Sequence, residues 1–416
     1  MDSARPTRRG VLQLMAGAPA LAAAAPAAAV PEPAFPTRAD LDLPPGLIHL
    51  NTASAGPTPK RVLERTVAAW RAVESDPVRM SYGTDPDTAV GAADAVRAKA
   101  AALVGCSADE ILVTRGTTDG IATLAAAVRL REGDHVLLTD QEHEGGETGW
   151  LHRARRDGIV VDRVPIPFGD HDVAAILHRF EAAIGPRTRA VCVSHVLSPT
   201  GLRMPIAEIA ARARRRGALT LVDGAQAVGQ IQVDVKALGC DAYATSGHKW
   251  LMGPKGTGFL YVAREAGEAI DPPQWLMGRN YGSNSQGLGP MPLAVGLGAA
   301  IDAMRAIGLA RVERHNLALA ARIHAAFGAM PHLTLASPPP GPLATALVAA
   351  RLPAPIDSLP LRRRMHDRHG IIIKMAEKRW FNGLRLSPHI FNDEAEVDHA
   401  LAALRTELEA MRDGAG

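Results

Sequence analysis

The run Leu219-Thr-Leu-Val-Asp223-Gly-Ala-Gln226 is followed by the run Asp241-Ala-Tyr-Ala-Thr-Ser246-Gly-His248-Lys249, so that Lys249 lies 26 positions after Asp223. In each run a short apolar stretch leads to a charged residue. A lysine so placed can hold an aldehyde as a Schiff base, and a carboxylate can pair with a protonated ring nitrogen to make an electron sink. The layout therefore indicates a pyridoxal-phosphate site.

Each of these two residues also has an ordinary structural interpretation. Lys249 could be a surface lysine, and Lys255 is close by on an equally loop-like stretch. Asp223 could cap a helix or begin a turn before Gly224. A carboxylate at the end of a buried strand is costly to desolvate without a partner, however, and a pyridinium nitrogen would supply that partner.

Short apolar stretches alternate with helical patterns over much of the chain. This alternation predicts an α/β protein with a mostly parallel, seven-stranded sheet flanked by helices, whose ligands gather at the carboxyl ends of the strands. A dinucleotide-binding fold is disfavoured because no Gly-x-Gly-x-x-Gly turn follows the first strand. The expected strands are 111–113, 135–139, 159–164, 190–194, 218–222, 242–245 and 258–262, and the expected helices between them are 117–129, 145–157, 172–184 and 205–216.

The pattern changes beyond Pro290, where two long helices precede a Pro-rich stretch and a shorter mixture of strands and helices. We predict a large domain over 47–290 and a smaller C-terminal α+β domain over 291–416. The expected elements of the smaller domain are helices at 293–306, 309–328, 356–369 and 393–412, and strands at 345–350, 371–374 and 384–386.

The first thirty residues resemble a twin-arginine signal peptide. Arg8 and Arg9 precede an Ala-rich apolar stretch that ends in Ala27-Ala28-Ala29. An Ala-rich leader or a membrane anchor is the alternative, but prolines interrupt the stretch and make it a poor bilayer span. We therefore predict a signal peptide over 1–29, a Pro-rich linker over 30–46, recognition by the twin-arginine export machinery, and a periplasmic or otherwise exported protein.

Composition excludes several other classes of protein. With 47% hydrophobic and 21% charged residues the chain is globular rather than disordered. A net charge of +3 gives no footprint for nucleic acid. Three cysteines without a framework spacing argue against a disulfide scaffold, and no metal site is expected because no matching ligand pair is evident.

Several motifs together resemble the aminotransferase class V, cysteine desulfurase-like superfamily of fold type I pyridoxal-phosphate enzymes, and the isopenicillin N epimerase-like branch in particular. The resemblance covers about His49 to Val397. It implies the cofactor pyridoxal 5'-phosphate and a homodimer with active sites between subunits. In similar enzymes a histidine stacks on the pyridine ring, and here that position falls on His143.

The resemblance assigns the remaining cofactor contacts residue by residue. Thr117 and Thr118 follow a strand and open a helix, where backbone N–H groups meet a phosphate. Each motif also has an ordinary structural interpretation, as a helix cap, a solvated loop or a core hydrogen bond. The assigned residues are Thr117, Thr118, Ser246 and His248 for the phosphate, His195 and Gln226 for the phenolic oxygen, Asp223 for the ring nitrogen and Lys249 for the aldehyde.

Arg385, in Gly383-Leu-Arg385-Leu-Ser387-Pro-His389, matches the family segment whose arginine grips the substrate α-carboxylate. A planar guanidinium forks onto a carboxylate with two hydrogen bonds, which a lysine cannot reproduce. The alternative is a surface ion pair. We expect a small-molecule amino acid or a peptide-borne amino acid as the substrate.

Two departures from the family pattern limit what the resemblance implies. Similar desulfurases carry a reactive cysteine shortly before that arginine, but residues 366–384 contain none, which disfavours sulfur transfer through a persulfide. Many relatives also contribute a threonine from the partner subunit to the phosphate. Here the corresponding stretch reads Gly282-Ser-Asn-Ser-Gln286-Gly, so the residue with that role is open.

These observations predict an enzyme that acts on an amino group, with Lys249 as the catalytic base that removes the Cα proton. Aminotransferase-type chemistry is the main expectation. Epimerisation and C–S or β-lyase chemistry on the same scaffold stay open, as does an exported binding protein that keeps the fold without turnover.

Overall fold

The computed structural model describes residues 34–83, 85–275 and 291–412. The expected signal peptide (1–29) lies outside these ranges, so export stays a prediction. The same holds for the stretch 282–287, where the partner-subunit phosphate contact was left open. Within the described part of the expected linker, Arg38–Asp40 form one turn of 3-10 helix, and the Asp40 carboxylate accepts hydrogen bonds from the Thr37 backbone at 2.7 Å and its hydroxyl at 3.0 Å.

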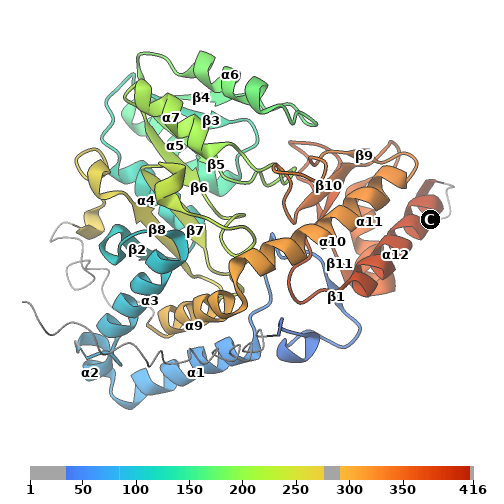
Figure 1. Ribbon diagram of the computed structural model, residues 1–416, viewed down its shortest axis with the longest axis horizontal. Helices are drawn as coiled ribbons and strands as arrows, with labels where there is room; N and C mark the ends of the chain where they lie inside the picture. The colour runs from blue at the N-terminus through green and yellow to red at the C-terminus, as the bar shows by residue number, and fades with distance from the viewer. Residues whose placement is uncertain (1–33, 84, 276–290, 413–416) are drawn as a thin grey trace, which may run out of the picture. The chain divides into compact units, whose positions relative to one another are not determined.

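A seven-stranded sheet lies at the centre of the larger hydrophobic cluster (Figure 1). The strand order is β2-β8-β7-β6-β5-β3-β4, and all pairs are parallel except those that β8 makes with β2 and β7. The predicted mostly parallel sheet is therefore confirmed. The strands are β2 (Ile111–Thr114), β3 (His135–Thr139), β4 (Val160–Val164), β5 (Thr188–Ser194), β6 (Leu219–Asp223), β7 (Ala242–Ser246) and β8 (Gly258–Val262).

The central strands are buried on both faces, which is why they are almost continuously apolar rather than alternating. The connecting helices provide this cover. They are α4 (Thr117–Ala127), α5 (Glu144–Asp157), α6 (Val173–Ala183), α7 (Ile206–Arg215) and α8 (Val235–Leu238).

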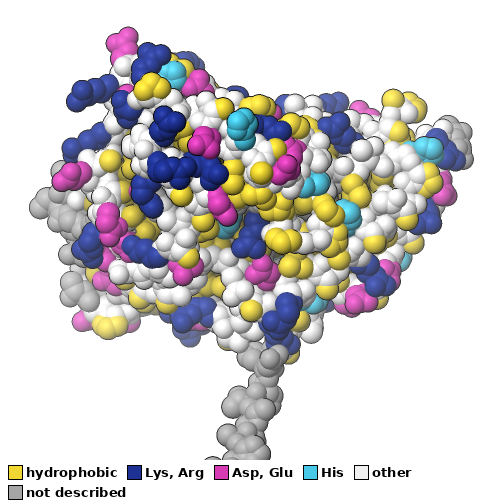
Figure 2. All heavy atoms as spheres, turned by 45° about the horizontal axis from the view of Figure 1, so that its top comes forward, with side chains coloured by type: hydrophobic (Ala, Val, Ile, Leu, Met, Phe, Trp, Pro, Cys, Tyr) yellow, Lys and Arg dark blue, Asp and Glu magenta, His cyan; other side chains and the backbone are white. Residues whose placement is uncertain are grey.

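The helix α7 illustrates how sequence pattern sets orientation. Ile209 and Ala213 are buried, while Arg214 and Arg215 are exposed in the last turn, where cations interact favourably with the helix dipole. Lys and Arg side chains are interspersed with Asp and Glu over the face of the molecule that Figure 2 shows.

Three helices precede the sheet in a stretch where the sequence analysis predicts no element: α1 (Lys60–Ser75), α2 (Pro77–Tyr82) and α3 (Ala89–Val104). Both α1 and α3 pack against α9 (Met291–Ile307). Since α3 is Ala-rich and buried on several sides, it lacks the polar face that marks a surface helix.

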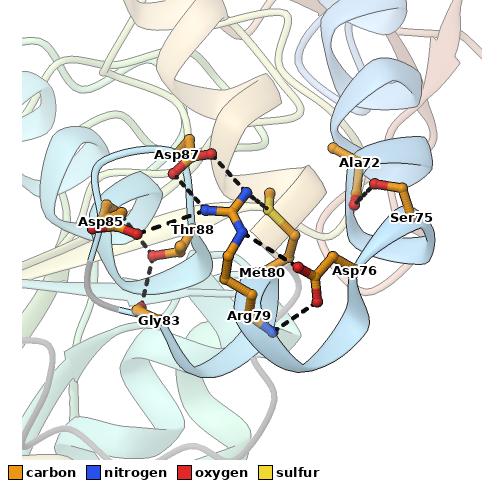
Figure 3. A network of polar contacts seen from close by, with 9 residues as sticks. All are labelled: Ala72, Ser75, Asp76, Arg79, Met80, Gly83, Asp85, Asp87 and Thr88. Atoms are coloured by element: carbon orange, nitrogen blue, oxygen red, sulfur yellow. Dashed lines mark hydrogen bonds and ion pairs between the residues drawn. The ribbon is translucent and has the colours of Figure 1, made fainter.

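A network around Arg79 ties the end of α2 to the loop before α3 (Figure 3). The guanidinium lies 3.0 Å from the Asp87 carboxylate, 3.4 Å from Asp76 and 3.6 Å from Asp85. The four side chains are between about half and two thirds exposed, so these ion pairs stabilise the fold only slightly.

The C-terminal part has its own antiparallel sheet, in the order β12-β13-β10-β9, and its own hydrophobic cluster. The N-terminal strand β1 (Ile48–His49) joins it by pairing with β11 (Ile371–Ile372). The proposed boundary near residue 290 stays a prediction. The remaining elements are α10 (Leu309–Ala329), β9 (Thr334–Leu335), β10 (Val348–Arg351), α11 (Ser358–His369), β12 (Lys374–Met375), β13 (Gly383–Leu386) and α12 (Glu394–Arg412).

The predicted strand at 345–350 is displaced in the structure, where β10 begins only at Val348. The first residues of the predicted strand instead bind loops of the larger sheet. The Thr345 hydroxyl donates to the Gly201 carbonyl at 2.7 Å, and the Ala346 N–H donates to the Gln230 side chain at 2.9 Å. These long-range hydrogen bonds hold the segment out of the ladder.

Among the described helices, none is both long and apolar enough to cross a bilayer alone; α9 and α10 meet that test only as a pair, with a bend of 79° between them.

Candidate active site

Three parallel strands deliver polar residues to one edge of the sheet. Ser194 ends β5 and is paired in register with Asp223 at the end of β6, and Asp223 is in turn paired with Ala244 of β7. The strand β7 ends at Ser246, three residues before Lys249. Since the strands are parallel, their carboxyl ends lie together, which is where such sheets bind ligands.

A cavity of about 710 Å³ opens at this edge. It is lined by residues from the sheet edge, from α4 and α5, from the N-terminal segment and from the C-terminal strands. Nine of the ten predicted site residues line it: Thr117, Thr118, His143, Asp223, Gln226, Ser246, His248, Lys249 and Arg385.

One corner of the cavity suits a phosphate. The Thr117 N–H, at the start of α4, donates to Ser246 Oγ at 2.9 Å. Gly116 has φ +147°, and a Cβ there would lie 3.4 Å from Ser246 Oγ and 3.5 Å from His248 Cε1, so a side chain would fill the corner. His248 Nδ1 is buried without a hydrogen-bond partner among the described residues. A helix N-terminus beside hydroxyl groups and an imidazole is a favourable place for an anion.

Lys249 is partly accessible, and its accessible part faces the cavity. Burial lowers the pKa of Lys249 to about 8, although Asp223 opposes this shift. The positive charges of Arg385 and, to a smaller extent, Lys374 lower the pKa of Lys249 further. A depressed pKa makes the free amine available near neutral pH, as a nucleophile or base requires.

Asp223 is a buried carboxylate that lacks a cationic partner at ion-pair distance within the described ranges. The Ala225 N–H donates to its Oδ1 at 2.9 Å, and burial raises its pKa. Gly146 stands opposite, where a Cβ would lie 3.1 Å from Oδ2. The carboxylate and the space beside it fit a protonated ring nitrogen, which would offset the cost of burial.

His143 is exposed towards the cavity from the N-cap of α5. Its Nδ1 accepts a hydrogen bond from the Gly145 N–H at 3.0 Å, which fixes the ring orientation. A flat ring held in this way can stack on a planar ligand.

The two residues assigned to the phenolic oxygen are placed differently from the rest. His195 is buried outside the cavity lining, with Nδ1 2.9 Å from the Tyr243 hydroxyl, and burial lowers its pKa to about 3. Gln226 does line the cavity, but its amide donates to the Ala53 carbonyl and accepts from Trp250 Nε1, both at 2.9 Å. The structure thus brings His195 close to the site without bringing it into the cavity.

Arg385 reaches the cavity from β13 and is 5% exposed. Its Nη1 donates to the Ser198 carbonyl at 2.7 Å and hydroxyl at 2.9 Å, and its Nη2 lies 3.4 Å from Ser54 Oγ. Its Nε is buried without a hydrogen-bond partner in the part of the chain that the structure describes, and burial lowers the pKa of Arg385 to about 10. A buried guanidinium held only by neutral groups is suited to bind an anion.

Glu142 is buried directly before the lining residue His143, outside the cavity lining itself, and sequence reasoning missed its burial. In the sequence it belongs to an acidic and histidine cluster typical of a solvated loop, but it is 3% exposed. Its carboxylate accepts from Thr139 Oγ1 at 2.7 Å and from Ser194 Oγ at 2.5 Å. Burial raises the pKa of Glu142 to about 7, and the charge of Asp223 contributes.

Several residues that line the cavity lack a sequence signal. Ser54 and Ser198 position Arg385, while Lys374 and Trp380 line the cavity from the C-terminal strands and the loop between them. Single serines and lysines are common on surfaces, so only the fold marks these as site residues.

A cavity that joins a partly buried amine, an unpaired buried carboxylate and a phosphate corner, at the edge of a mostly parallel sheet, defines a pyridoxal-phosphate site of fold type I. The chain matches the family model of aminotransferase class-V over residues 48–399. The protein therefore belongs to the aminotransferase class-V family, and its cofactor is pyridoxal 5'-phosphate.

Its relatives are enzymes with different named activities. Isopenicillin N epimerase of Amycolatopsis lactamdurans is 33% identical over 88% of this chain and 97% of its own length. A probable cysteine desulfurase of Methanothermobacter thermautotrophicus is 32% identical over 69% of this chain and 74% of its own. A structure of a C-DES mutant with glycine covalently linked to the PLP cofactor has a TM-score of 0.80 at 24% identity, covering 89% of this chain and 99% of that one.

We expect Glu142→Gln to change how stability depends on pH. Because the folded-state pKa of about 7 is above the ordinary value of 4.5, the folded protein binds more protons between these values, and wild-type stability falls as pH rises through this window. A shift of this size corresponds to about 3 kcal/mol. Urea unfolding from pH 4.5 to 8 should show the variant gaining roughly that much relative to wild type.

The exposed residue Glu144, two positions after Glu142 in the first turn of α5, provides a matched control, since Glu144→Gln removes a carboxyl group that is not buried. Its pH profile should parallel that of wild type. A parallel profile for Glu142→Gln as well would contradict the assignment of a costly buried carboxylate.

Proposed function

We propose that this enzyme acts on the amino group of an amino acid, free or peptide-borne, by aminotransferase-type chemistry. One observation carries the proposal: Lys249 and Arg385 face the same cavity, the first a partly buried amine and the second a guanidinium without an acidic partner within the described ranges. An amine that moves a proton beside an arginine that binds a carboxylate is suited to a substrate with an α-carboxylate.

Pyridoxal phosphate, when bound, supplies an electron sink for the charge left at Cα after deprotonation. The chain's own residues would do the rest. Asp223 would hold the ring nitrogen in its protonated form, and the corner at Thr117, Ser246 and His248 would hold the phosphate. Lys249 Nζ would hold the aldehyde between turnovers and, once free, move the Cα proton.

Sulfur transfer through a persulfide is not proposed. The chain has three cysteines, none of which lines the cavity: Cys106 is partly buried, and Cys192 and Cys240 are buried. Burial raises the pKa of Cys106 to about 12 and disfavours its thiolate. A loop cysteine between 366 and 384 is excluded by the sequence itself.

Epimerisation is the second candidate. It is favoured by the near-complete coverage of isopenicillin N epimerase, and by His143, a second group able to exchange a proton at the cavity wall. Returning the proton to the opposite face of Cα would invert the centre, whereas amino-group transfer leaves a 2-oxo acid. Loss of a β-substituent would make the enzyme a lyase.

One labelling experiment separates these outcomes. The holoenzyme is incubated in deuterated water with ¹⁵N-labelled amino acids, peptides and a 2-oxo acid acceptor, and the products are analysed by mass spectrometry and chiral chromatography. We expect ¹⁵N in the acceptor. Deuterium at Cα with inverted configuration and no ¹⁵N transfer would replace the proposal with epimerisation, and labelled ammonia would replace it with lyase chemistry.

The role of Lys249 predicts where borohydride fixes the cofactor. Reduction of the purified protein should leave the cofactor bonded to the peptide that contains Lys249, and Lys249→Ala should abolish this adduct together with more than 99% of turnover. Peptide mass spectrometry measures the first effect. Lys255→Met is the control, because Lys255 is six residues away and its Nζ donates to the Gly56 carbonyl at 2.7 Å, outside the cavity lining. An adduct on Lys255, or one that survives in Lys249→Ala, would refute the assignment.

We also infer a homodimer, as the resemblance implies. On α1, the side chains of Leu63, Val67 and Trp70 form one apolar stripe and are 42%, 41% and 47% exposed. The adjoining buried face of α1 packs on α9 and leaves this stripe exposed, so a second copy is the natural cover for it. Light scattering should give twice the chain mass for wild type and a lower mass for Trp70→Glu; a monomeric wild type would contradict the inference.

A further inference from the structure

Two cationic side chains enter the cavity from neighbouring strands of the C-terminal sheet. Lys374 of β12 lies directly opposite Arg385 of β13 in the antiparallel register, and both residues line the cavity. Directly opposed residues project from the same face of a sheet with Cβ atoms roughly 5 Å apart. The two positive charges are therefore close neighbours.

Neither charge has an anionic partner among the described residues. Arg385 is held by the neutral groups of Ser198 and Ser54, and its Nε is buried without any partner. Lys374 is itself partly buried. Within the described ranges, its ammonium group has no carboxylate within 4.0 Å and makes no hydrogen bond. Two adjacent cations in this setting repel each other and pay for lost hydration.

The acidic residue with most influence on both groups is engaged elsewhere. Glu377 lines the cavity and its charge opposes the lowered pKa of Lys374 and of Arg385. Its carboxylate, however, lies 3.0 Å from Arg379 Nε. Lys249, which also lines the cavity, is affected by Lys374 too, since the charge of Lys374 helps to lower the pKa of Lys249.

A single carboxylate on the guanidinium fork of Arg385 would neutralise one of these charges. The second charge, that of Lys374 on the same wall of the cavity, would still face the ligand. We propose that the substrate carries a second carboxylate, on an acidic side chain, which Lys374 binds while Arg385 binds the carboxylate next to the reacting amine. This inference rests on the proposed function, because it takes Arg385 as the α-carboxylate site.

The test measures binding without turnover. The holoenzyme is titrated calorimetrically with succinate, glutarate and adipate, and with the monoacids of equal chain length, butyrate, pentanoate and hexanoate; none has an amino group to react. We expect at least one diacid to bind about tenfold more tightly than its monoacid, the effect of one added charged hydrogen bond. Lys374→Met should reduce that ratio to about one and leave monoacid affinity within about twofold.

Lys378→Met is the matched control. Lys378 is four residues away on the same segment, has a side chain that is 71% exposed, and lies 3.6 Å from Asp357 outside the cavity. This variant should keep the wild-type ratio. Arg385→Lys should weaken monoacids and diacids alike. Thermal unfolding of each variant checks that the fold is retained.

Three results would overturn the proposal: no diacid preference in wild type, an unchanged preference in Lys374→Met, or an equal loss for both ligand types, which would mean that Lys374 assists the same carboxylate as Arg385. Failure of the proposed function looks different. In that case ¹⁵N transfer is absent while the diacid preference and its dependence on Lys374 persist.

Discussion

Desolvation of a few charged groups at one edge of the sheet is the constraint on which this structure depends. Asp223 and Arg385 are buried, and neither has an ion-pair partner among the described residues. Such groups are costly unless a ligand neutralises them. The fold therefore holds an arrangement of charges whose natural complement is an anionic, ring-containing cofactor and a carboxylate-bearing substrate.

Hydrogen bonds from the surrounding scaffold keep these groups in place. Ser198 and Ser54 hold the guanidinium of Arg385, and the Ala225 N–H holds the Asp223 carboxylate. Glu142 joins the loop before α5 to β5 through Ser194, directly beside the stacking position at His143. Catalytic groups that face a cavity from several elements need this kind of support, because each strand end or helix start fixes only its own residue.

Much of the fold was predictable from the sequence. All seven strands of the main sheet and the helices α4 to α7 follow the pattern of apolar runs, because buried parallel strands and amphipathic helices leave clear signals. The short helix α8 was not predicted. The helices α1 to α3 were missed, as were the split of 371–374 into β11 and β12 and the late start of β10. These depend on long-range contacts, such as the hydrogen bonds of Thr345 and Ala346.

By itself the sequence determined the spacing of Asp223 and Lys249 at two strand ends, the motifs that carry the family resemblance, and the lack of a cysteine before Arg385. Only the tertiary structure decided that Glu142 is buried, that His195 turns to Tyr243 and away from the cavity lining, and that Lys374 lies opposite Arg385. The physical reason is that burial, hydrogen-bond partners and strand register join residues far apart in the chain, whereas local sequence patterns record only periodicity and turn chemistry.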